Sequence, residues 1–469
     1  MNDHEIDELL QKQKQFFQTG RTLDVQWRLQ QLIRLKIAVQ SHVQELQDAL
    51  KADLGRAKEE AYLTDIGPLI MEINEAIQNC RRWAKEETHF SGLAAFPGLI
   101  TKVYKMPYGS VLIISPFNFP VLLSLGVLVP AIAAGNTAVI KMSSKSTHCT
   151  EAVKKMISQT FPQEYVTAVD GGHDTADRLL AKRFDKIFYT GSPAVGKHVL
   201  AMAAENLVPA ALELGGETGN WCIIRKDADL KDAARKIAFF KMCNAGQICI
   251  NINQVAVAAE VRDAFIQELI KAFDRQLPDA LSSEEYPCLI STQAYDRCAA
   301  EAEEYRDRIV YGGYGNRETR KYAPTLICPV GIDEPVVMHE LFNPLLPVVE
   351  YRDEEINDLL KTIGSREHGL ALYLFTKDTA WAKKTMASMQ YGGGCINEVC
   401  MHLTVRGVPF NGTGHSGMGA YHGEWGYREF SHPSTVFIGS SKFNLSLREH
   451  PYSGRKNAWK YQFMKIFER

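Results

Sequence analysis

The feature that most constrains this chain is an alternation of short apolar runs with helical stretches, which begins at Gly109. The runs are rich in β-branched residues and occupy 111–114, 137–141, 165–169, 186–189 and 221–224. Strands that lie parallel in one sheet need a crossover connection, usually a helix, and these crossovers are right-handed. The alternation therefore predicts a doubly wound α/β sheet.

A second series of the same kind follows Glu213. Its predicted strands are 254–258, 309–311, 345–350 and 371–376, with helices such as 261–275 and 379–389 between them. At roughly 100–200 residues per domain, a chain of 469 residues suggests two to four domains. No flexible linker separates the two series, so we expect two α/β domains of similar size that pack closely.

The first 85 residues show the three- and four-residue periodicity of amphipathic helices. The pattern predicts helices over 2–17, over 22–54 and over about 65–85. Thr22 is expected to cap the second helix and Gly55 to end it.

Composition and charge exclude several classes of protein. The chain carries 53 Lys+Arg against 55 Asp+Glu, a net charge of −2, which gives no reason to expect nucleic acid or an anionic membrane as a partner. Ten cysteines lie scattered without a C-x-x-C pair, so we expect no metal site and a reducing, cytoplasmic location. The most apolar stretch, 111–134, contains Asn118 and three prolines, which favours a strand, a loop and a buried helix over a membrane anchor.

Four loops at strand ends carry polar residues that could do chemistry. In the first, 115–120, Asn118 follows a buried strand, and its amide could donate to an oxyanion, an interaction worth roughly 2.7–4 kcal/mol. Taken alone, an Asx turn is the commoner explanation. In the second, Gly191 and Ser192 open a helix, where a phosphate could bind. The spacing to Gly196 is G-S-x-x-x-G rather than the usual dinucleotide fingerprint, so this signal is weak alone.

The third and fourth loops supply a carboxylate and a thiol. Glu213 ends an apolar run, where burial would raise its pKa and suit it to act as a general base, although a surface Glu beside a Gly-Gly turn is commoner. Cys249 follows Gly-Gln in a loop and is a candidate nucleophile. Most unpaired cysteines are simply buried small hydrophobes, and Cys243 is a nearby competitor for the role.

Taken together and in this order, the loops resemble the motifs of the aldehyde dehydrogenase superfamily. The matching segments are Pro-Phe-Asn-Phe-Pro at 116–120, Gly-Asn-Thr-Ala-Val-Ile-Lys at 135–141, Thr-Gly-Ser at 190–192, Leu-Glu-Leu-Gly-Gly at 212–216, Gly-Gln-Ile-Cys at 246–249 and Glu-Leu-Phe at 340–342. The stretch 409–423 further resembles the class 3 branch, which acts on fatty, aromatic and related aldehydes. The resemblance covers the whole chain. It implies an aldehyde dehydrogenase-like fold with two doubly wound α/β domains and a small bridging β element.

The resemblance implies NAD(P)-dependent oxidation of a medium-chain aliphatic or aromatic aldehyde to the carboxylic acid. Cys249 would attack the aldehyde, Asn118 and the Cys249 backbone N–H would hold the oxyanion, and Glu213 would activate the water that hydrolyses the thioester. For NAD or NADP, the implied contacts are Lys141, Ser144, Gly191, Ser192, Gly196, Leu214, Gly215, Glu340 and Phe342. For the aldehyde, they are Phe117, Phe119, Tyr62 and the loop 395–415.

The resemblance also divides the chain into domains. The NAD(P)-binding domain would comprise 1–87 and 107–212, and the catalytic domain 213–410. The segments 88–106 and 425–469 would bridge two subunits of a homodimer.

Four departures from the family pattern bear on function. Ser144 stands where the family usually has Glu, so the repulsion of a 2′-phosphate is lost and NADP should be tolerated or preferred. Glu217 replaces a Lys and would raise the pKa of Glu213 if it pointed inward. Asn343 and Asn411 replace glycines, and because Asn tolerates positive φ well, we expect the backbone path to survive.

Three other functions fit the motifs less well. CoA-acylating relatives generally lack the carboxylate at the Glu213 position. A non-catalytic protein with the same fold would have no use for Cys249, Glu213 and Asn118 together. A cysteine hydrolase would leave the nucleotide-binding motifs unexplained.

Overall fold

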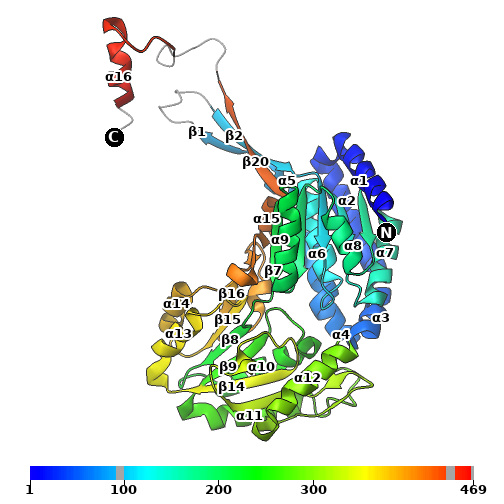
Figure 1. The fold of residues 1–469 in the computed structure, drawn as a ribbon, viewed down its shortest axis with the longest axis vertical. Coiled ribbons are helices and arrows are strands. Elements are labelled where there is room, and N and C mark those ends of the chain that lie inside the picture. Colours follow the sequence, from blue (N-terminus) through cyan, green and yellow to red (C-terminus); the bar gives the residue numbers. More distant parts are fainter. Residues whose placement is uncertain (91–99, 440–448, 466–469) are drawn as a thin grey trace.

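The computed structural model describes residues 1–90, 100–439 and 449–465. Two α/β bodies lie against each other, and a narrow arm projects from the first of them (Figure 1). The chain begins in the first body, and the last helix lies at the far end of the arm.

Helices form the N-terminal part, as predicted, but the second one is broken. The helices are α1 (Asp3–Gln18), α2 (Val25–Ser41), α3 (Val43–Leu54), α4 (Lys58–Ala61) and α5 (Gly67–Ala84), with a π-helical stretch (Tyr62–Ile66) before α5. His42 leaves the helical conformation at φ −107°, so the single helix predicted over 22–54 is wrong. Asp24, not Thr22, caps α2 by accepting from the Gln26 amide at 2.9 Å. Gly55 ends α3 with a positive φ, as predicted.

The first sheet is doubly wound. Its strands are β3 (Ser110–Ile114), β4 (Thr137–Lys141), β5 (Val166–Val169), β6 (Lys186–Gly191), β7 (Ala210–Leu214) and β18 (Gly417–Met418), in the order β18-β7-β6-β3-β4-β5. All pairs are parallel except β18–β7. The connecting helices are α6 (Leu122–Ala134), α7 (Thr147–Thr160), α8 (His173–Leu180) and α9 (Pro193–Glu205). The chain reverses its direction of winding between β3 and β6, which is where such sheets bind ligands.

The second sheet is larger. Its strands are β8 (Asn220–Ile224), β9 (Ile252–Ala258), β10 (Ile309–Tyr311), β13 (Thr325–Val330), β14 (Leu345–Tyr351), β15 (Ala371–Phe375) and β16 (Gly393–Ile396), in the order β10-β13-β14-β9-β8-β15-β16. Its helices are α10 (Leu230–Met242), α11 (Arg262–Gln276), α12 (Thr292–Glu304), α13 (Ile356–Gly364) and α14 (Thr379–Ser388). The sequence analysis missed β13 and β16, and it grouped β8 with the first series.

The arm is a three-stranded antiparallel sheet. It consists of β1 (Glu87–Phe90), β2 (Ile100–Pro107) and β20 (Ser431–Ile438), in the order β1-β2-β20. Helix α15 (Gly423–Glu429) packs on α5 and α6 before β20 begins, and α16 (Ala458–Met464) follows the arm. Two short hairpins, β11 (Gly315–Asn316) with β12 (Lys321–Tyr322) and β17 (Phe410–Asn411) with β19 (Ala420–Tyr421), complete the strands. Among the described residues, none of the helices combines the length and apolar character needed to cross a membrane.

Candidate active site

The thiol of Cys249 lies in a tightly wound loop between α10 and β9. Asn244, Ala245 and Gly246 have φ values of 49°, 50° and 78°, a left-handed run that only Gly adopts without strain. Residue 246 has to be glycine, because a Cβ there would lie 2.2 Å from the carbonyl oxygen of Asn343. The loop therefore holds Cys249 in a fixed position at the edge of a cavity.

The thiol of Cys249 is protonated at rest. Burial, and then the negative charges of Glu340 and Glu213, raise its pKa to about 12. The influence of both carboxylates shows that they lie near the sulfur. A thiolate here needs a base to take the proton or a positive charge brought nearby.

Glu213 is the candidate base. It lies near the end of β7, is 4% exposed, and its Oε2 has no hydrogen-bond partner among the described residues. Burial, and then the charge of Glu429, raise its pKa well above the ordinary value. A carboxylate of this kind is a stronger base than one in water.

Glu217 does not point inward, so the rise in the pKa of Glu213 that was expected from an inward-pointing carboxylate does not arise from it. Its carboxylate is half exposed and pairs with Lys197 at 3.3 Å and with His415 at 2.8 Å. The like charge near Glu213 comes instead from Glu429, on α15.

Asn118 is buried, with 3% of its surface exposed, in the loop after β3. Its Nδ2 donates to the carbonyl of Gln247 at 3.1 Å, which ties it to the Cys249 loop and leaves one amide hydrogen for another acceptor. Its own carbonyl accepts from Nδ2 of Asn244 at 3.0 Å. Asn118 is thus placed to donate beside the thiol, as an oxyanion requires.

A buried ion pair that the sequence analysis did not identify supports this arrangement. Arg56 is fully buried and donates to Asp65 at 2.8 Å, to Oδ1 of Asn244 at 3.0 Å and to the carbonyl of Asn118. Its guanidinium also lies over the ring of Phe119, 4.4 Å from the centroid. One side chain therefore connects the Asn118 loop to the Cys249 loop. Its partners are 9 to 188 residues away in sequence, so no local motif marks it.

An apolar cavity of about 220 Å³ opens beside Cys249. Phe119 lines it as predicted, together with Met71, Phe240, Ile248, Phe410 and Tyr421. Tyr62 does not: it is 46% exposed, and Leu63 and Thr64 line the cavity in its place. Cys400, Met401 and residues 403–406, within the predicted loop, also line it.

Phe117 lies on the other side of the thiol, toward the residues predicted to bind NAD(P). Its ring packs edge-on against Phe342, with centroids 5.9 Å apart. Phe342 has a φ of 54°. The positive φ expected of Asn343 and Asn411 is not found, because the left-handed residue is the one before Asn343. Asn343 instead donates from Nδ2 to Glu301 at 2.6 Å.

The Glu340 carboxylate has a buried oxygen that could accept a hydrogen bond from a cofactor hydroxyl. Its Oε1 is buried and has no hydrogen-bond partner among the described residues, and burial raises its pKa to about 8. A Cβ at Gly215 would lie 2.1 Å from this oxygen, so only glycine leaves room for it. This oxygen is free to accept a hydrogen bond from a hydroxyl, and the contact of Glu340 with a ribose stays a prediction.

The remaining predicted nucleotide contacts gather at the carboxyl ends of β4, β6 and β7. Lys141 ends β4 and is buried, which lowers its pKa. Ser144 is exposed in the following loop, and Ser192 is exposed at the N-cap of α9. Gly191 and Leu214 end β6 and β7, and Gly196 lets α9 approach Leu214, since a Cβ there would lie 2.9 Å from that side chain. The described residues contain no cluster of His, Cys, Asp or Glu that could hold a metal ion.

Comparison with known proteins identifies this arrangement. The family model described as "Aldehyde dehydrogenase family" matches residues 1–436. The chain is 35% identical to the 4,4'-diaponeurosporen-aldehyde dehydrogenase of Staphylococcus aureus over 98% of its own length and 99% of that protein. It is 33% identical to the dimeric NADP-preferring aldehyde dehydrogenase of Rattus norvegicus, over 93% and 95%. A substrate-bound structure of Staphylococcus aureus AldH superposes with a TM-score of 0.94 at 34% identity, covering 99% of both chains.

Proposed function

Because this chain belongs to the aldehyde dehydrogenase family, whose members oxidise aldehydes with NAD or NADP, we propose that it converts an apolar aldehyde to the carboxylic acid through a covalent intermediate on Cys249. The observation that carries the proposal is a thiol at the edge of an apolar cavity, with the buried, unpartnered carboxylate of Glu213 acting on its pKa and the Asn118 amide bonded to the same loop.

In the first step, the Cys249 sulfur forms a bond to the carbonyl carbon as its proton leaves. Glu213 is the nearby base, and its raised pKa makes it able to take that proton. The carbonyl oxygen becomes an oxyanion, which accepts hydrogen bonds from Asn118 Nδ2 and from the backbone N–H of Cys249. The adduct is a thiohemiacetal.

Bound NAD or NADP would supply the hydride acceptor, so that loss of hydride from the thiohemiacetal carbon would leave a thioester on Cys249. Glu340 would hold the ribose next to the nicotinamide ring, and Phe342, braced by Phe117, would hold the ring against Cys249. Lys141 and Ser192 would hold the far ribose and the pyrophosphate at the strand ends.

Glu213 releases the proton that it took from Cys249 to solvent before the last step. It then removes a proton from water, and the resulting hydroxide attacks the thioester carbon. The carbon–sulfur bond breaks, and the products are the carboxylic acid and the free thiol. The burial of Glu213 favours this role, because a desolvated carboxylate holds the proton more strongly. The absence of a hydrogen-bond partner on Oε2 leaves that oxygen able to accept one from water.

The cavity supports a substrate class of medium-chain aliphatic or aromatic aldehydes. Most of its lining is aliphatic, aromatic or sulfur-containing, which favours the burial of apolar surface, and Glu72, Glu75, Arg406 and His422 also line it. The relative from Staphylococcus aureus is named for 4,4'-diaponeurosporen-aldehyde.

Absorbance of the reduced cofactor tests the proposal. Hexanal and benzaldehyde are given with NAD or with NADP, each with and without CoA. We expect turnover without CoA that disappears in Cys249→Ala. Turnover that requires CoA would replace the proposal with an acylating enzyme. Turnover that survives in Cys249→Ala would remove the covalent mechanism.

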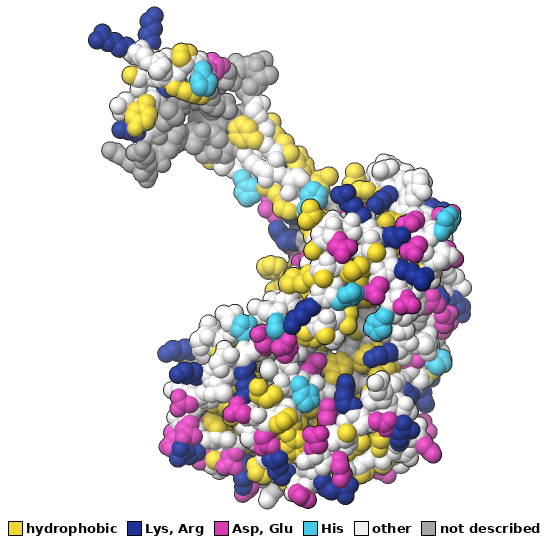
Figure 2. Space-filling model, in the orientation of Figure 1, with side chains coloured by type: hydrophobic (Ala, Val, Ile, Leu, Met, Phe, Trp, Pro, Cys, Tyr) yellow, Lys and Arg dark blue, Asp and Glu magenta, His cyan; other side chains and the backbone are white. Residues whose placement is uncertain are grey.

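We further propose that the arm joins two copies of the chain into a homodimer. The arm stands away from the body and carries exposed apolar side chains, including Phe90, Ile100 and Phe437 (Figure 2). An exposed, apolar edge of a sheet is a template for pairing with another chain. Light scattering of the wild type should give twice the mass of the chain, and Phe437→Glu should weaken the dimer. A monomeric wild type would refute the proposal.

A further inference from the structure

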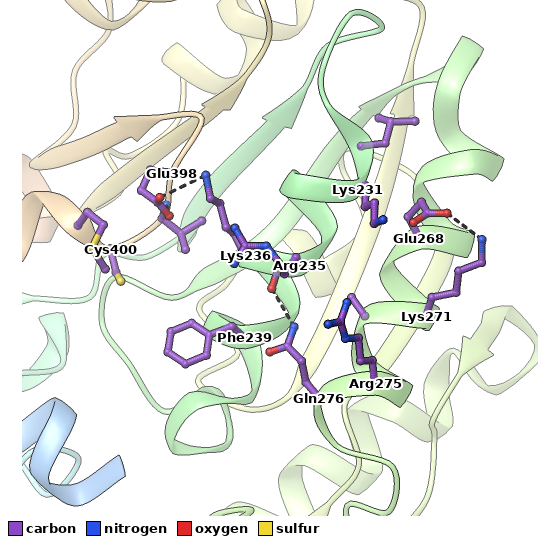
Figure 3. A pocket seen from close by; sticks show the side chains of 14 residues that line it. Lys231, Arg235, Lys236, Phe239, Glu268, Lys271, Arg275, Gln276, Glu398 and Cys400 are labelled. Atoms are coloured by element: carbon purple, nitrogen blue, oxygen red, sulfur yellow. Dashed lines mark hydrogen bonds and ion pairs between the residues drawn. The ribbon is translucent and has the colours of Figure 1, made fainter. Parts of the chain in front are cut away.

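A second hollow lies outside the cavity, between helices α10 and α11 (Figure 3). It is an open groove of about 920 Å³. Lys231, Arg235 and Phe239 face it from α10 at four-residue intervals, and Lys271 and Arg275 face it from α11. Residues 398–401 close the side opposite α11. We call it the basic groove.

The basic groove continues the cavity beside Cys249. Phe239, Cys400 and Met401 line both hollows. Phe239 and Met401 are each 43% exposed, so an apolar rim rather than a wall separates the two. The hydrocarbon chain of a substrate that extends out of the cavity across this rim enters the groove.

The groove carries excess positive charge. Five basic residues line it against two carboxylates, Glu268 and Glu398. Lys271 pairs with Glu268 at 2.7 Å and Lys236 with Glu398 at 3.2 Å. Arg235 pairs with Asp232 at 2.8 Å.

Two cations at the far end of the groove remain available. In the part of the chain that the structure describes, neither Lys231 nor Arg275 has a carboxylate partner. Lys231 lies eight residues before Phe239 on α10, which places it about 12 Å from the rim. Positive charge without a counter-charge therefore lies at the end of the groove that is distant from the thiol.

We propose that the basic groove binds a carboxylate at the far end of the aldehyde, so that the enzyme prefers ω-oxo carboxylic acids to neutral aldehydes of the same length. The inference rests on the proposed function, because it needs the aldehyde group to lie at Cys249. The hydrocarbon chain occupies the apolar cavity and crosses the rim at Phe239. The distal carboxylate reaches Lys231 and Arg275, whose charges have no other partner.

Matched substrates test the inference. The assay compares kcat/KM for 12-oxododecanoic acid with that for its methyl ester, which has the same chain without the charge. The variant is the double substitution Lys231→Glu, Arg275→Glu, and the control is Lys361→Glu, an exposed lysine on α13. We expect the wild type to prefer the acid roughly three- to tenfold, the range for two exposed charge contacts. The preference should vanish in the double variant and remain in the control.

Equal kcat/KM for acid and ester in the wild type, with normal turnover of hexanal, would overturn the inference and leave the proposed function standing. A preference that survives in the double variant would also overturn it. If the wild type turns over no aldehyde, the proposed function fails instead. Binding measured by calorimetry then tests the basic groove without turnover. Dodecanedioate should bind more tightly than dodecanoate to the wild type, and the two should bind equally tightly to the double variant. Equal binding to the wild type refutes the groove.

Discussion

Replacing Arg56 with Met tests how far the active site depends on one buried ion pair. Met keeps the apolar length of the side chain but removes every hydrogen bond that the guanidinium donates. Asp65 is then left buried with no cation beside it, although the Leu122 amide still donates to it. Asn118 loses one of the donors to its carbonyl, so the oxyanion donor should also lose its fixed position.

The size of the effect follows from the burial of both partners, whose side chains have no exposed surface. Removing one partner of a buried ion pair costs about 3–5 kcal/mol. For 469 residues unfolding as one unit, about 2.1 cal/mol/K per residue gives an unfolding entropy of roughly 1 kcal/mol/K. The melting temperature of Arg56→Met should therefore fall by about 3–5 °C.

The effect should depend on pH in a definite direction. Burial already raises the pKa of Asp65 to about 6 in the presence of Arg56, from 3.8. Without the guanidinium this pKa rises further. A carboxyl whose folded pKa lies above the unfolded value stabilises the fold at low pH and loses that contribution as pH rises through the folded pKa. The loss in melting temperature should thus be smaller at pH 5 than at pH 8.

Calorimetry of four proteins checks the reasoning: the wild type, Arg56→Met, Asp65→Asn and the double variant, at one protein concentration. The double variant removes the buried charge and keeps an acceptor for the Leu122 amide, so it should recover at least half of the loss and show little dependence on pH. A fall below about 1 °C in Arg56→Met would refute the argument. A double variant that is less stable than Arg56→Met would also refute the argument.

Three further predictions concern the chemistry. Cys249→Ser should abolish aldehyde oxidation. Cys243→Ser changes a buried thiol that donates to Glu60 and should keep most of the activity. Equal losses of activity in the two variants, measured by cofactor absorbance, would contradict the assignment of Cys249 as the nucleophile. Because the pKa of Glu213 lies well above 4.5, its carboxylate fraction grows as pH rises through that value, so kcat should rise with pH where deacylation limits the rate. Glu213→Gln should lower kcat roughly 10²–10⁴-fold, slow the first equivalent of reduced cofactor as well, because the same carboxylate takes the Cys249 proton, and flatten this pH profile; an unchanged profile in stopped-flow traces would exclude Glu213 as the base. Ser144→Glu should lower kcat/KM for NADP at least tenfold while that for NAD changes little, and an equal change for both cofactors would remove the role of Ser144 in selectivity.

Most strands that the sequence predicted are uninterrupted apolar runs, although 345–350 was predicted with Pro347 inside it. The run at 137–141 matches β4 residue for residue. The strand β13 was missed because Pro329 lies inside it, and β16 because it begins with two glycines, both of which are unfavourable in strands. The break at His42 has no Pro or Gly to mark it, so a periodic pattern alone could not locate it.

The sequence predicted the site residues that belong to a loop motif. It did not predict the residues that tertiary packing brings to the site. Asn118, Glu213 and Cys249 each belong to a motif at a strand or helix end. Glu429 acts on Glu213 only because α15 packs against the first body, 216 residues further along the chain. Tyr62 was misplaced because a π-helical stretch begins there, and a π-helix turns by a different angle per residue from an α-helix, which brings Leu63 and Thr64 to the cavity.

The pairing of β18 with β7 has a consequence for biosynthesis. Gly417 lies opposite Glu213, so the edge of β7 that carries the catalytic carboxylate stays open until about 200 more residues have been translated. At roughly 5–20 residues per second, that interval is about 10–40 s. During it the ribosome holds a nascent sheet with an unpaired edge, the kind of surface on which chains aggregate and chaperones act. Ribosome-bound fragments that end before residue 417 should therefore carry the finished cysteine loop without a closed nucleotide-binding sheet.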